Sequence, residues 1–235
     1  MPDAPEMGRT GKERNYYAAG LNAINLARVY ETSIPRVVRY LEEEIAFVRC
    51  RLRGCERLLE VAAGYGRIMR ELAASVAEVD GIDISPANVA YGEKYLKDCP
   101  NCRLLVMDVH EMRLARKYDV ALCLQNGLSA VKGDAADTVK SVLETLLPGG
   151  RAYFSTYSDR FWEHRLLWFA EQSEKGLLGE IDYERTGDGK IVCKDGFTAT
   201  TFDEADLRHF GDASGCPYRL ELVDESSLFL IIEKP

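Results

Sequence analysis

Short apolar runs alternate with longer amphipathic stretches through the middle of the chain. Five runs have the length and composition of buried strands: 57–61, 78–84, 103–107, 118–124 and 151–156. Apolar residues recur at helical spacing in the stretches between them: 67–77, 85–95 and 134–147. Strands that alternate with helices on short connections predict an α/β fold, with a parallel sheet and helices on both of its faces.

The two ends of the chain follow other patterns. Residues 15–51 read as helical, with a break or a first helical turn at Pro35, and 160–172 and 203–210 also have helical spacing. The last apolar run, 228–233, is predicted to be a final strand. The polar stretch Cys193–Lys194–Asp195–Gly196 is expected to be a hairpin turn, with a substrate loop as the alternative.

Glycine and carboxylate residues stand where the predicted strands end. The turn EVAAGYGRIM, which covers 60–69, carries almost no side chain at Gly64 and Gly66, so another group can approach its backbone. Asp83 and Asp108 end the next two strands. Ligands of parallel sheets bind at the carboxyl ends of the strands. A nucleoside cofactor needs such bare backbone, a carboxylate for its ribose hydroxyls and an acceptor for its adenine amine.

Composition narrows the class of protein. The 235 residues carry a formal net charge of −8, which argues against nucleic acid as a partner. No apolar run has the ~20 residues of a membrane span, and the polar N-terminus lacks a signal-peptide core, so we expect a cytoplasmic protein and no membrane partner. The seven cysteines are expected to be reduced thiols. A four-thiolate zinc site is the alternative for Cys50, Cys55, Cys99 and Cys102, but we predict no metal.

These motifs in this order resemble the class I S-adenosylmethionine-dependent methyltransferases of the small, single-domain kind. Residues 60–66 match the family's first motif with Ala62 in place of a glycine, 107–109 the third, 118–127 the fourth, and 147–150 the "LPGG" turn. The match covers roughly residues 55–158. It implies a Rossmann-like, seven-stranded, mostly parallel sheet, and S-adenosyl-L-methionine as the cofactor. The cofactor contacts it implies are Glu60, Ala62, Gly64, Gly66, Asp83, Ile84, Asp108, Val109 and Gln125.

The resemblance also implies roles within that set. Glu60 and Gly64 would face the methionine part, Asp83 the ribose, Asp108 and Val109 the adenine, and Gln125 the other side of the cofactor. A nicotinamide enzyme is the competing cofactor class, but its fingerprint wants a third glycine where Met69 stands. A protein that binds the adenosyl cofactor without catalysis is a further alternative.

The domain division follows from these patterns. Residues 1–54 are expected to form an N-terminal helical cap, and 55–235 the methyltransferase domain, in which about 157–205 covers the substrate. Aromatic residues of that segment either enclose a substrate or form a core-facing helical stripe, and the stripe is favoured for Trp162, Leu166 and Phe169. The chain is expected to be a monomer or a homodimer.

The reaction makes few demands on catalytic side chains. Displacement at a sulfonium needs a positioned nucleophile and the exclusion of water, and a general base only if the acceptor arrives protonated. The sequence lacks the Asn/Asp-Pro-Pro-aromatic motif of base-amine enzymes and any Pro-Cys setting. We therefore expect a small-molecule acceptor methylated on N, O or S, with a protein or RNA as the alternative. Candidate catalytic residues are Tyr16, Tyr17, His110, Asn126, Tyr157 and His164.

Overall fold

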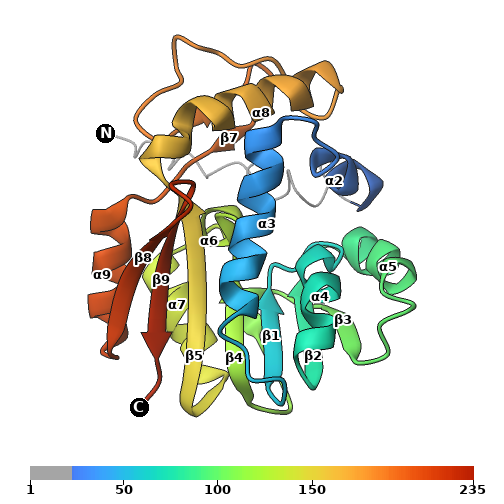
Figure 1. Cartoon of the computed structure of the whole chain (residues 1–235). Coiled ribbons are helices and arrows are strands. Elements are labelled where there is room, and N and C mark those ends of the chain that lie inside the picture. Colours follow the sequence, from blue (N-terminus) through green and yellow to red (C-terminus); the bar gives the residue numbers. More distant parts are fainter. Residues whose placement is uncertain (1–22) are drawn as a thin grey trace, which may run out of the picture.

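The computed structural model describes residues 23–235, so Tyr16 and Tyr17 lie outside the described residues. Within them, seven strands form one sheet in the order β3-β2-β1-β4-β5-β9-β8 (Figure 1). The strands are β1 (Arg57–Val61), β2 (Glu78–Asp83), β3 (Cys102–Val106), β4 (Tyr118–Cys123), β5 (Leu146–Tyr157), β8 (Tyr218–Val223) and β9 (Ser227–Glu233). Strand β9 runs antiparallel to both of its neighbours, β5 and β8, and the other neighbouring strands pair in parallel. The predicted seven-stranded, mostly parallel sheet is confirmed.

Helices cover both faces of the sheet, as predicted, and each face has its own apolar core. On one face, α3 (Pro35–Arg49), α4 (Arg67–Leu72) and α5 (Pro86–Tyr95) pack against residues such as Leu58 and Val120. On the other face lie α6 (Gly127–Val131), α7 (Ala135–Glu144) and α9 (Glu204–Ser214). Because both faces are covered, the central strands β1, β2 and β4 are buried along most of their length.

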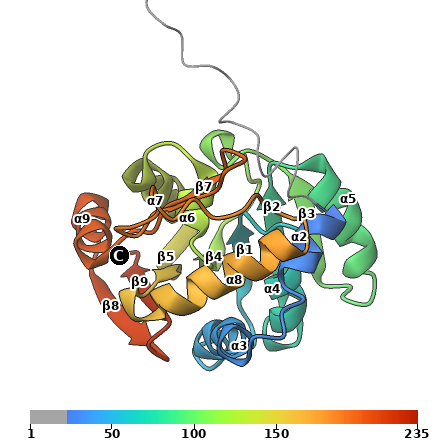
Figure 2. The same cartoon turned by 90° about the horizontal axis from the view of Figure 1, so that it is seen from above.

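A third apolar cluster lies above the carboxyl ends of the strands. It joins α2 (Ala23–Val29), the first half of α3, α8 (Trp162–Glu174) and the small hairpin of β6 (Ile191–Val192) and β7 (Thr198–Ala199). Seen from above, α8 crosses over the ends of β5, β4 and β1, and α2 lies between α8 and α5 (Figure 2). This arrangement encloses the end of the sheet where ligands are expected.

Local signals explain several helix starts. Ser85 caps α5 by accepting a hydrogen bond from the Asn88 N–H at 3.3 Å, and Pro86 takes the first helical position, as predicted. Asp203 and Asp206 cap α9 reciprocally, in a capping box. Pro35 is the first residue of α3, so of the two alternatives, a break within a helix or a first helical turn, the first helical turn is correct.

Three elements differ from the sequence-based expectation. The helix after β1 is shorter than 67–77, because a 3₁₀ turn, η2 (Ala73–Ser75), follows its end at Leu72. Strand β5 begins at Leu146, so the Pro-Gly-Gly turn lies within the strand. Strand β8 was not predicted, since it is an edge strand with charged, partly exposed residues and no clean alternation. The turn at Cys193–Gly196 connects β6 to β7, which confirms the hairpin.

Candidate active site

The turn after β1 brings bare backbone to the middle of the sheet edge. Ala62, Gly64 and Gly66 all have positive φ, of 55°, 57° and 83°. The left-handed conformation costs alanine roughly 1–2 kcal/mol and glycine almost nothing. Ala62 therefore holds a strained conformation where the motif usually has glycine. A β-carbon on Gly64 would lie 2.9 Å from Leu26 Cδ2 of α2, so α2 approaches this turn closely.

Asp83 ties the turn to the next strand end. One carboxylate oxygen accepts a hydrogen bond from the Gly64 N–H at 2.9 Å. The other accepts from the Ser85 N–H at 2.9 Å and from Asn88 Nδ2 at 3.0 Å. Burial raises the pKa of Asp83, and these hydrogen bonds oppose the rise. The carboxylate is thus held rigidly beside the turn.

Glu60 and Arg67 flank the turn with buried polar atoms that lack partners. The Glu60 side chain is 4% exposed, and its Oε2 makes no hydrogen bond. Arg67 Nε and Nη2 are also buried without partners, while its guanidinium lies 4.6 Å from the Tyr30 ring centroid. Burial raises the pKa of Glu60 to about 8, although the Arg67 charge opposes this. Buried polar atoms are nearly always paired in folded proteins, so these atoms are candidates for binding a polar group.

Gln125 and Asn126 follow β4 on the same edge, with φ of 53° and 60°. The Gln125 N–H donates to Ser155 Oγ at 2.8 Å, and its side-chain Nε2 is buried without a partner. Both polar atoms of the Asn126 side chain make a hydrogen bond: Nδ2 donates to the Thr200 carbonyl at 2.7 Å and Oδ1 accepts from Thr156 at 3.0 Å. Asn126 therefore links the strand ends to the segment before α9.

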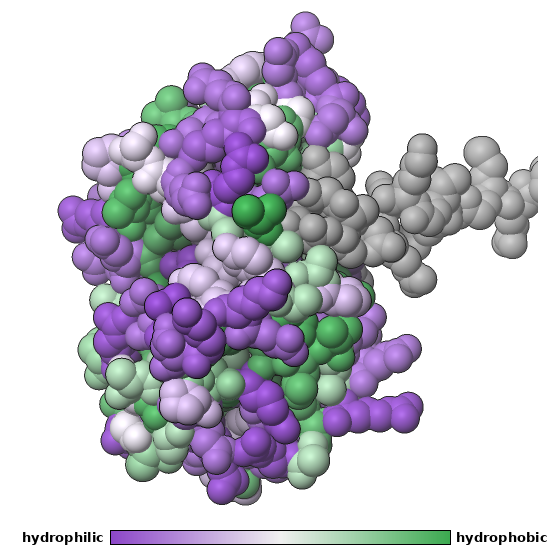
Figure 3. Space-filling view, turned by 90° about the vertical axis from the view of Figure 1, so that its right-hand side faces the viewer, coloured by the Kyte–Doolittle hydropathy of each residue, from purple (hydrophilic) through white to green (hydrophobic). Residues whose placement is uncertain are grey.

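The residues after β2 and β3 form a more open part of the edge. Ile84 and Val106 are large apolar side chains that are 54% and 52% exposed. Figure 3 shows the side of the molecule that carries α5, where hydrophobic areas are separated by hydrophilic ones. Asp108 caps the 3₁₀ turn η3 (Val109–Glu111) through the His110 N–H at 2.9 Å. The Val109 side chain is buried in the core, so only its backbone faces the edge.

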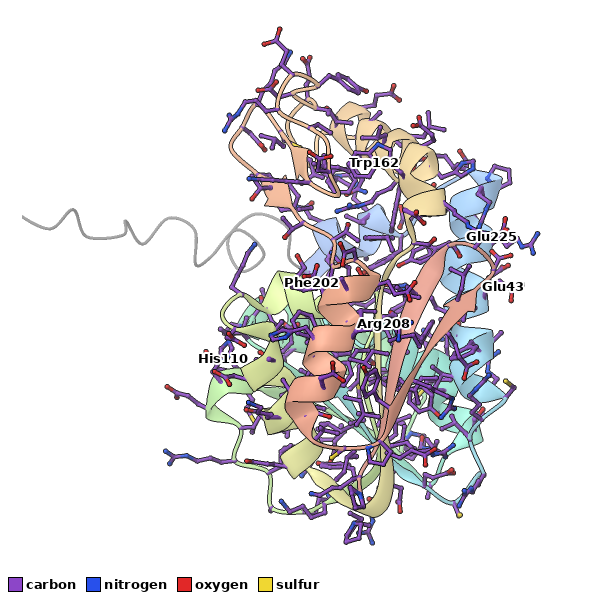
Figure 4. All side chains as sticks on the ribbon, turned by 90° about the vertical axis from the view of Figure 1, so that its left-hand side faces the viewer. Glu43, His110, Trp162, Phe202, Arg208 and Glu225 are labelled. Carbon is purple, nitrogen blue, oxygen red and sulfur yellow. The ribbon has the colours of Figure 1, made fainter. Side chains whose placement is uncertain are left out.

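The two histidine candidates lie in different places. His110 is exposed, and its Nε2 donates to the Lys132 carbonyl at 2.8 Å. Figure 4 shows His110 and Glu43 on opposite sides of the molecule. His164 is on α8, with its ring centroid 5.7 Å from that of Phe161.

Aromatic side chains are prominent in the third apolar cluster, which lies above the carboxyl ends of the strands and is called the roof below. The Tyr40 ring lies 5.4 Å from the Tyr157 ring, 4.9 Å from Phe161 and 6.2 Å from Trp168, centroid to centroid. The Trp168 indole donates to the Val29 carbonyl at 3.1 Å, which attaches α8 to α2. Trp162, Leu166 and Phe169 pack in the same cluster, which confirms the core-facing stripe.

Sequence reasoning missed Glu44, Tyr40 and Arg67. Glu44 is fully buried on α3, and its Oε1 accepts from Ser227 Oγ at 2.9 Å. Its spacing from the apolar residues Val37 and Val48 places a carboxylate on the buried face of an amphipathic helix. An acidic residue at a position that the helical spacing places among buried apolar residues was the feature of the sequence that could have revealed Glu44.

Other clusters stand apart from this edge. A cavity of about 220 Å³ lies at the amino ends of β2 and β3, where Asp80 pairs with Arg103 and Arg116 and accepts from the Tyr118 hydroxyl. Its charges are therefore satisfied within the protein. Within residues 23–235, no group of three or more His, Cys, Asp or Glu side chains is arranged to hold a metal ion. In that same range, no helix has the length and apolar content needed to cross a membrane.

Comparison with known proteins agrees with this geometry. Residues 58–150 match the family model of a methyltransferase domain. The chain is 29% identical over 146 residues to the putative methyltransferase YqeM of Bacillus subtilis, covering 54% of this chain and 59% of that protein. It is 27% identical over 123 residues to dTDP-4-amino-2,3,4,6-tetradeoxy-D-glucose N,N-dimethyltransferase of Saccharopolyspora spinosa, covering 51% and 48%. The chain thus spans about half the length of these curated relatives.

Solved structures share the whole fold. The N-methyltransferase NodS of Bradyrhizobium japonicum, in complex with S-adenosyl-L-homocysteine, has a TM-score of 0.57 at 14% identity, covering 91% of this chain and 98% of that one. DhpI with the same ligand has a TM-score of 0.64 at 17% identity, covering 91% and 93%. Residues 58–150 therefore match a methyltransferase domain, and the whole chain has the fold of these solved methyltransferases. Both of these solved structures contain S-adenosyl-L-homocysteine.

Proposed function

We propose that the chain transfers a methyl group from S-adenosyl-L-methionine to a small-molecule acceptor, on nitrogen, oxygen or sulfur. One observation supports S-adenosyl-L-methionine as the proposed cofactor. Glu60 Oε2, Arg67 Nε and Nη2, and Gln125 Nε2 are buried at the carboxyl ends of the strands without hydrogen-bond partners. A ligand with an ammonium and a carboxylate, such as the methionine part of the cofactor, offers partners for atoms of both kinds.

The residues around the turn fit the rest of the cofactor. Glu60, Ala62, Gly64 and Gly66 would hold the methionine part, with Arg67 added from the structure. Asp83 would accept from the ribose hydroxyls, because its carboxylate is already oriented beside Gly64. Ile84, Asp108 and Val109 would contact the adenine, and Gln125 would close the other side of the cofactor.

The bound cofactor supplies an electrophilic methyl group on a sulfonium with a neutral leaving group. The chain's own residues would exclude water and orient the acceptor. Tyr157 and His164 are candidates for acceptor contacts, because both lie beside Phe161 in the roof. Asn126 and His110 remain candidates whose side chains already make hydrogen bonds within the protein.

Enclosure supports a small acceptor. The segment of about 157–205 and the residues of 1–54 that are described, α2 and α3, together cover the strand ends. We propose that these two segments form the substrate cover, as the sequence division expects. Several relatives carry names of small-molecule methyltransferases, including the sugar dimethyltransferase above.

The seven free cysteines agree with a cytoplasmic location. We predict a monomer or a homodimer, and the molar mass measured by light scattering distinguishes the two.

Calorimetric titration with S-adenosylmethionine, S-adenosylhomocysteine and NAD tests this function. We expect binding of both adenosyl ligands, and loss of at least about tenfold in affinity in Asp83→Ala, because a carboxylate hydrogen bond to ligand is worth roughly 1.5–3 kcal/mol. Asp98→Ala, an exposed position before β3, is the matched control and should bind normally. Binding of NAD with no response to the adenosyl ligands would overturn the proposal. A screen of amine, hydroxyl and thiol acceptors then measures transfer.

A further inference from the structure

A second group of unpaired polar atoms lies in the roof, away from the turn. Glu44 is completely buried, and only its Oε1 accepts a hydrogen bond of good geometry, from Ser227 Oγ. Its Oε2 and the hydroxyl of Tyr40, one helical turn earlier on α3, are both buried and make no hydrogen bond of good geometry, although the Tyr40 hydroxyl lies close enough to this carboxylate to lower its pKa. A buried carboxylate oxygen without a hydrogen bond lowers the stability of the folded protein. The fold therefore keeps Glu44 at a cost in folding free energy.

This carboxylate lies close to the cofactor edge. Ser155 interacts with Glu44 and also accepts from the Gln125 N–H at the end of β4. The charge of Arg67 acts on both Glu44 and Glu60. Glu44 therefore faces, from α3, the same interior region that Glu60 faces from β1.

We propose that the acceptor is an amine that arrives protonated, and that Glu44 binds its ammonium group and takes its proton before methyl transfer. This inference rests on the function proposed above and names the substrate class of the same site. A carboxylate beside the faces of aromatic rings is the surrounding that an ammonium group prefers. Tyr40 interacts with Glu44, and the rings of Tyr157 and Trp168 lie 5.4 and 6.2 Å from the Tyr40 ring, centroid to centroid.

The chemistry favours an amine over an alcohol. Burial raises the pKa of Glu44 to about 7, while hydrogen bonds from Ser155 and Ser227 and the Arg67 charge oppose the rise. Ammonium groups have pKa values of roughly 8–10, so proton transfer to this carboxylate spans a gap of only about one to three pH units. A hydroxyl with the acidity of water, near 16, leaves a gap of about nine.

The balance of the reaction is simple. The ammonium proton moves to Glu44 Oε2, and the freed nitrogen lone pair forms the new N–C bond. The C–S bond breaks with its electron pair going to sulfur, which leaves S-adenosylhomocysteine and a methylated ammonium product. Glu44 releases its proton to solvent when the product leaves.

Binding to the S-adenosylhomocysteine complex tests the inference without turnover. The probes are 2-phenylethylamine and its uncharged analogue 2-phenylethanol, followed by calorimetry and by the fluorescence of Trp162 and Trp168, both on α8. We expect the amine to bind at least about tenfold more tightly than the alcohol. Glu44→Gln should abolish this preference, and Glu44→Asp should keep part of it. Glu42→Gln, an exposed position on the same helix, is the matched control and should keep all of it.

The pH dependence separates a binding role from a structural one. Amine affinity of the unmodified protein should rise between about pH 6 and 8, as Glu44 ionises, and should rise less in Glu44→Gln, in which Glu60 still ionises. The other titratable groups that act on this region are Tyr40 on α3, Tyr30 after α2, Arg67 on α4, Glu60 on β1 and Tyr157 on β5. Glu60 titrates in both proteins, so the difference between them reports Glu44.

The outcomes are distinct. Failure of S-adenosylhomocysteine to bind at all would refute the proposed function itself. If that ligand binds, equal affinity for the amine and the alcohol overturns the amine inference, as does absence of binding by both probes. A preference for the amine that survives in Glu44→Gln also overturns it. A melting curve for each variant confirms that the comparison is between folded proteins.

Discussion

Replacing Glu60 with glutamine should make the ligand-free protein more stable at alkaline pH. Glu60 is 4% exposed, and its Oε2 has no hydrogen-bond partner. Burial raises its pKa to about 8 from an ordinary value of 4.5. The folded protein therefore holds this proton across a pH range in which the unfolded chain has lost it. Stability contributed by this group is complete at acid pH and falls as the pH rises from about 4.5 through 8.

The size of the effect follows from the pKa shift. From about pH 5 to pH 8.5, Glu60 alone should lower the free energy of unfolding by roughly 4 kcal/mol, at about 1.36 kcal/mol for each unit by which the two pKa values differ. That loss is a large part of the 5–15 kcal/mol typical of folded domains. Glutamine keeps the shape and cannot ionise, so Glu60→Gln removes this component of the pH dependence.

Urea denaturation at a series of pH values measures it. The quantity to plot is the difference in free energy of unfolding between Glu60→Gln and the unmodified protein, which cancels groups that titrate equally in both. We expect that difference to grow in favour of the variant by several kcal/mol toward pH 8.5. Glu93→Gln, at an exposed position of α5, should show none. Parallel curves for the unmodified protein and Glu60→Gln would refute the burial argument.

Further substitutions test the packing and the site. Gly81→Ala places a β-carbon 2.4 Å from Met69 Sδ, so repacking should lower the free energy of unfolding by about 1–3 kcal/mol, measured in urea. Trp168→Phe leaves the buried Val29 carbonyl unpaired, and should cost about 1–3 kcal/mol and speed amide exchange in α2; unchanged exchange would contradict the attachment of that helix. Arg67→Met should weaken S-adenosylhomocysteine binding at least about tenfold in calorimetry, and an unchanged affinity would remove Arg67 from the site.

The mostly parallel sheet and the edge at which a ligand is expected followed from the sequence. Periodicity located β1, β2, β3 and β4 to within a residue or so at each end, because strands buried on both faces are continuous apolar runs. The positions of Gly64 and Asp83 at strand ends then followed, since parallel strands all end at one edge. Edge strand β8 was not predicted, because a half-exposed strand has only a weak pattern of apolar and polar residues.

The tertiary structure decided which distant residues meet. Glu44 on α3 contacts Ser227 on β9, 183 residues later, and neither residue belongs to a motif. Leu26 of α2 lies against Gly64, and Trp168 of α8 binds Val29. A local sequence pattern reports what one element buries, but not which other element covers it. The proposed cofactor edge is encoded in consecutive strand ends, whereas the proposed acceptor side is assembled from segments that only packing brings together.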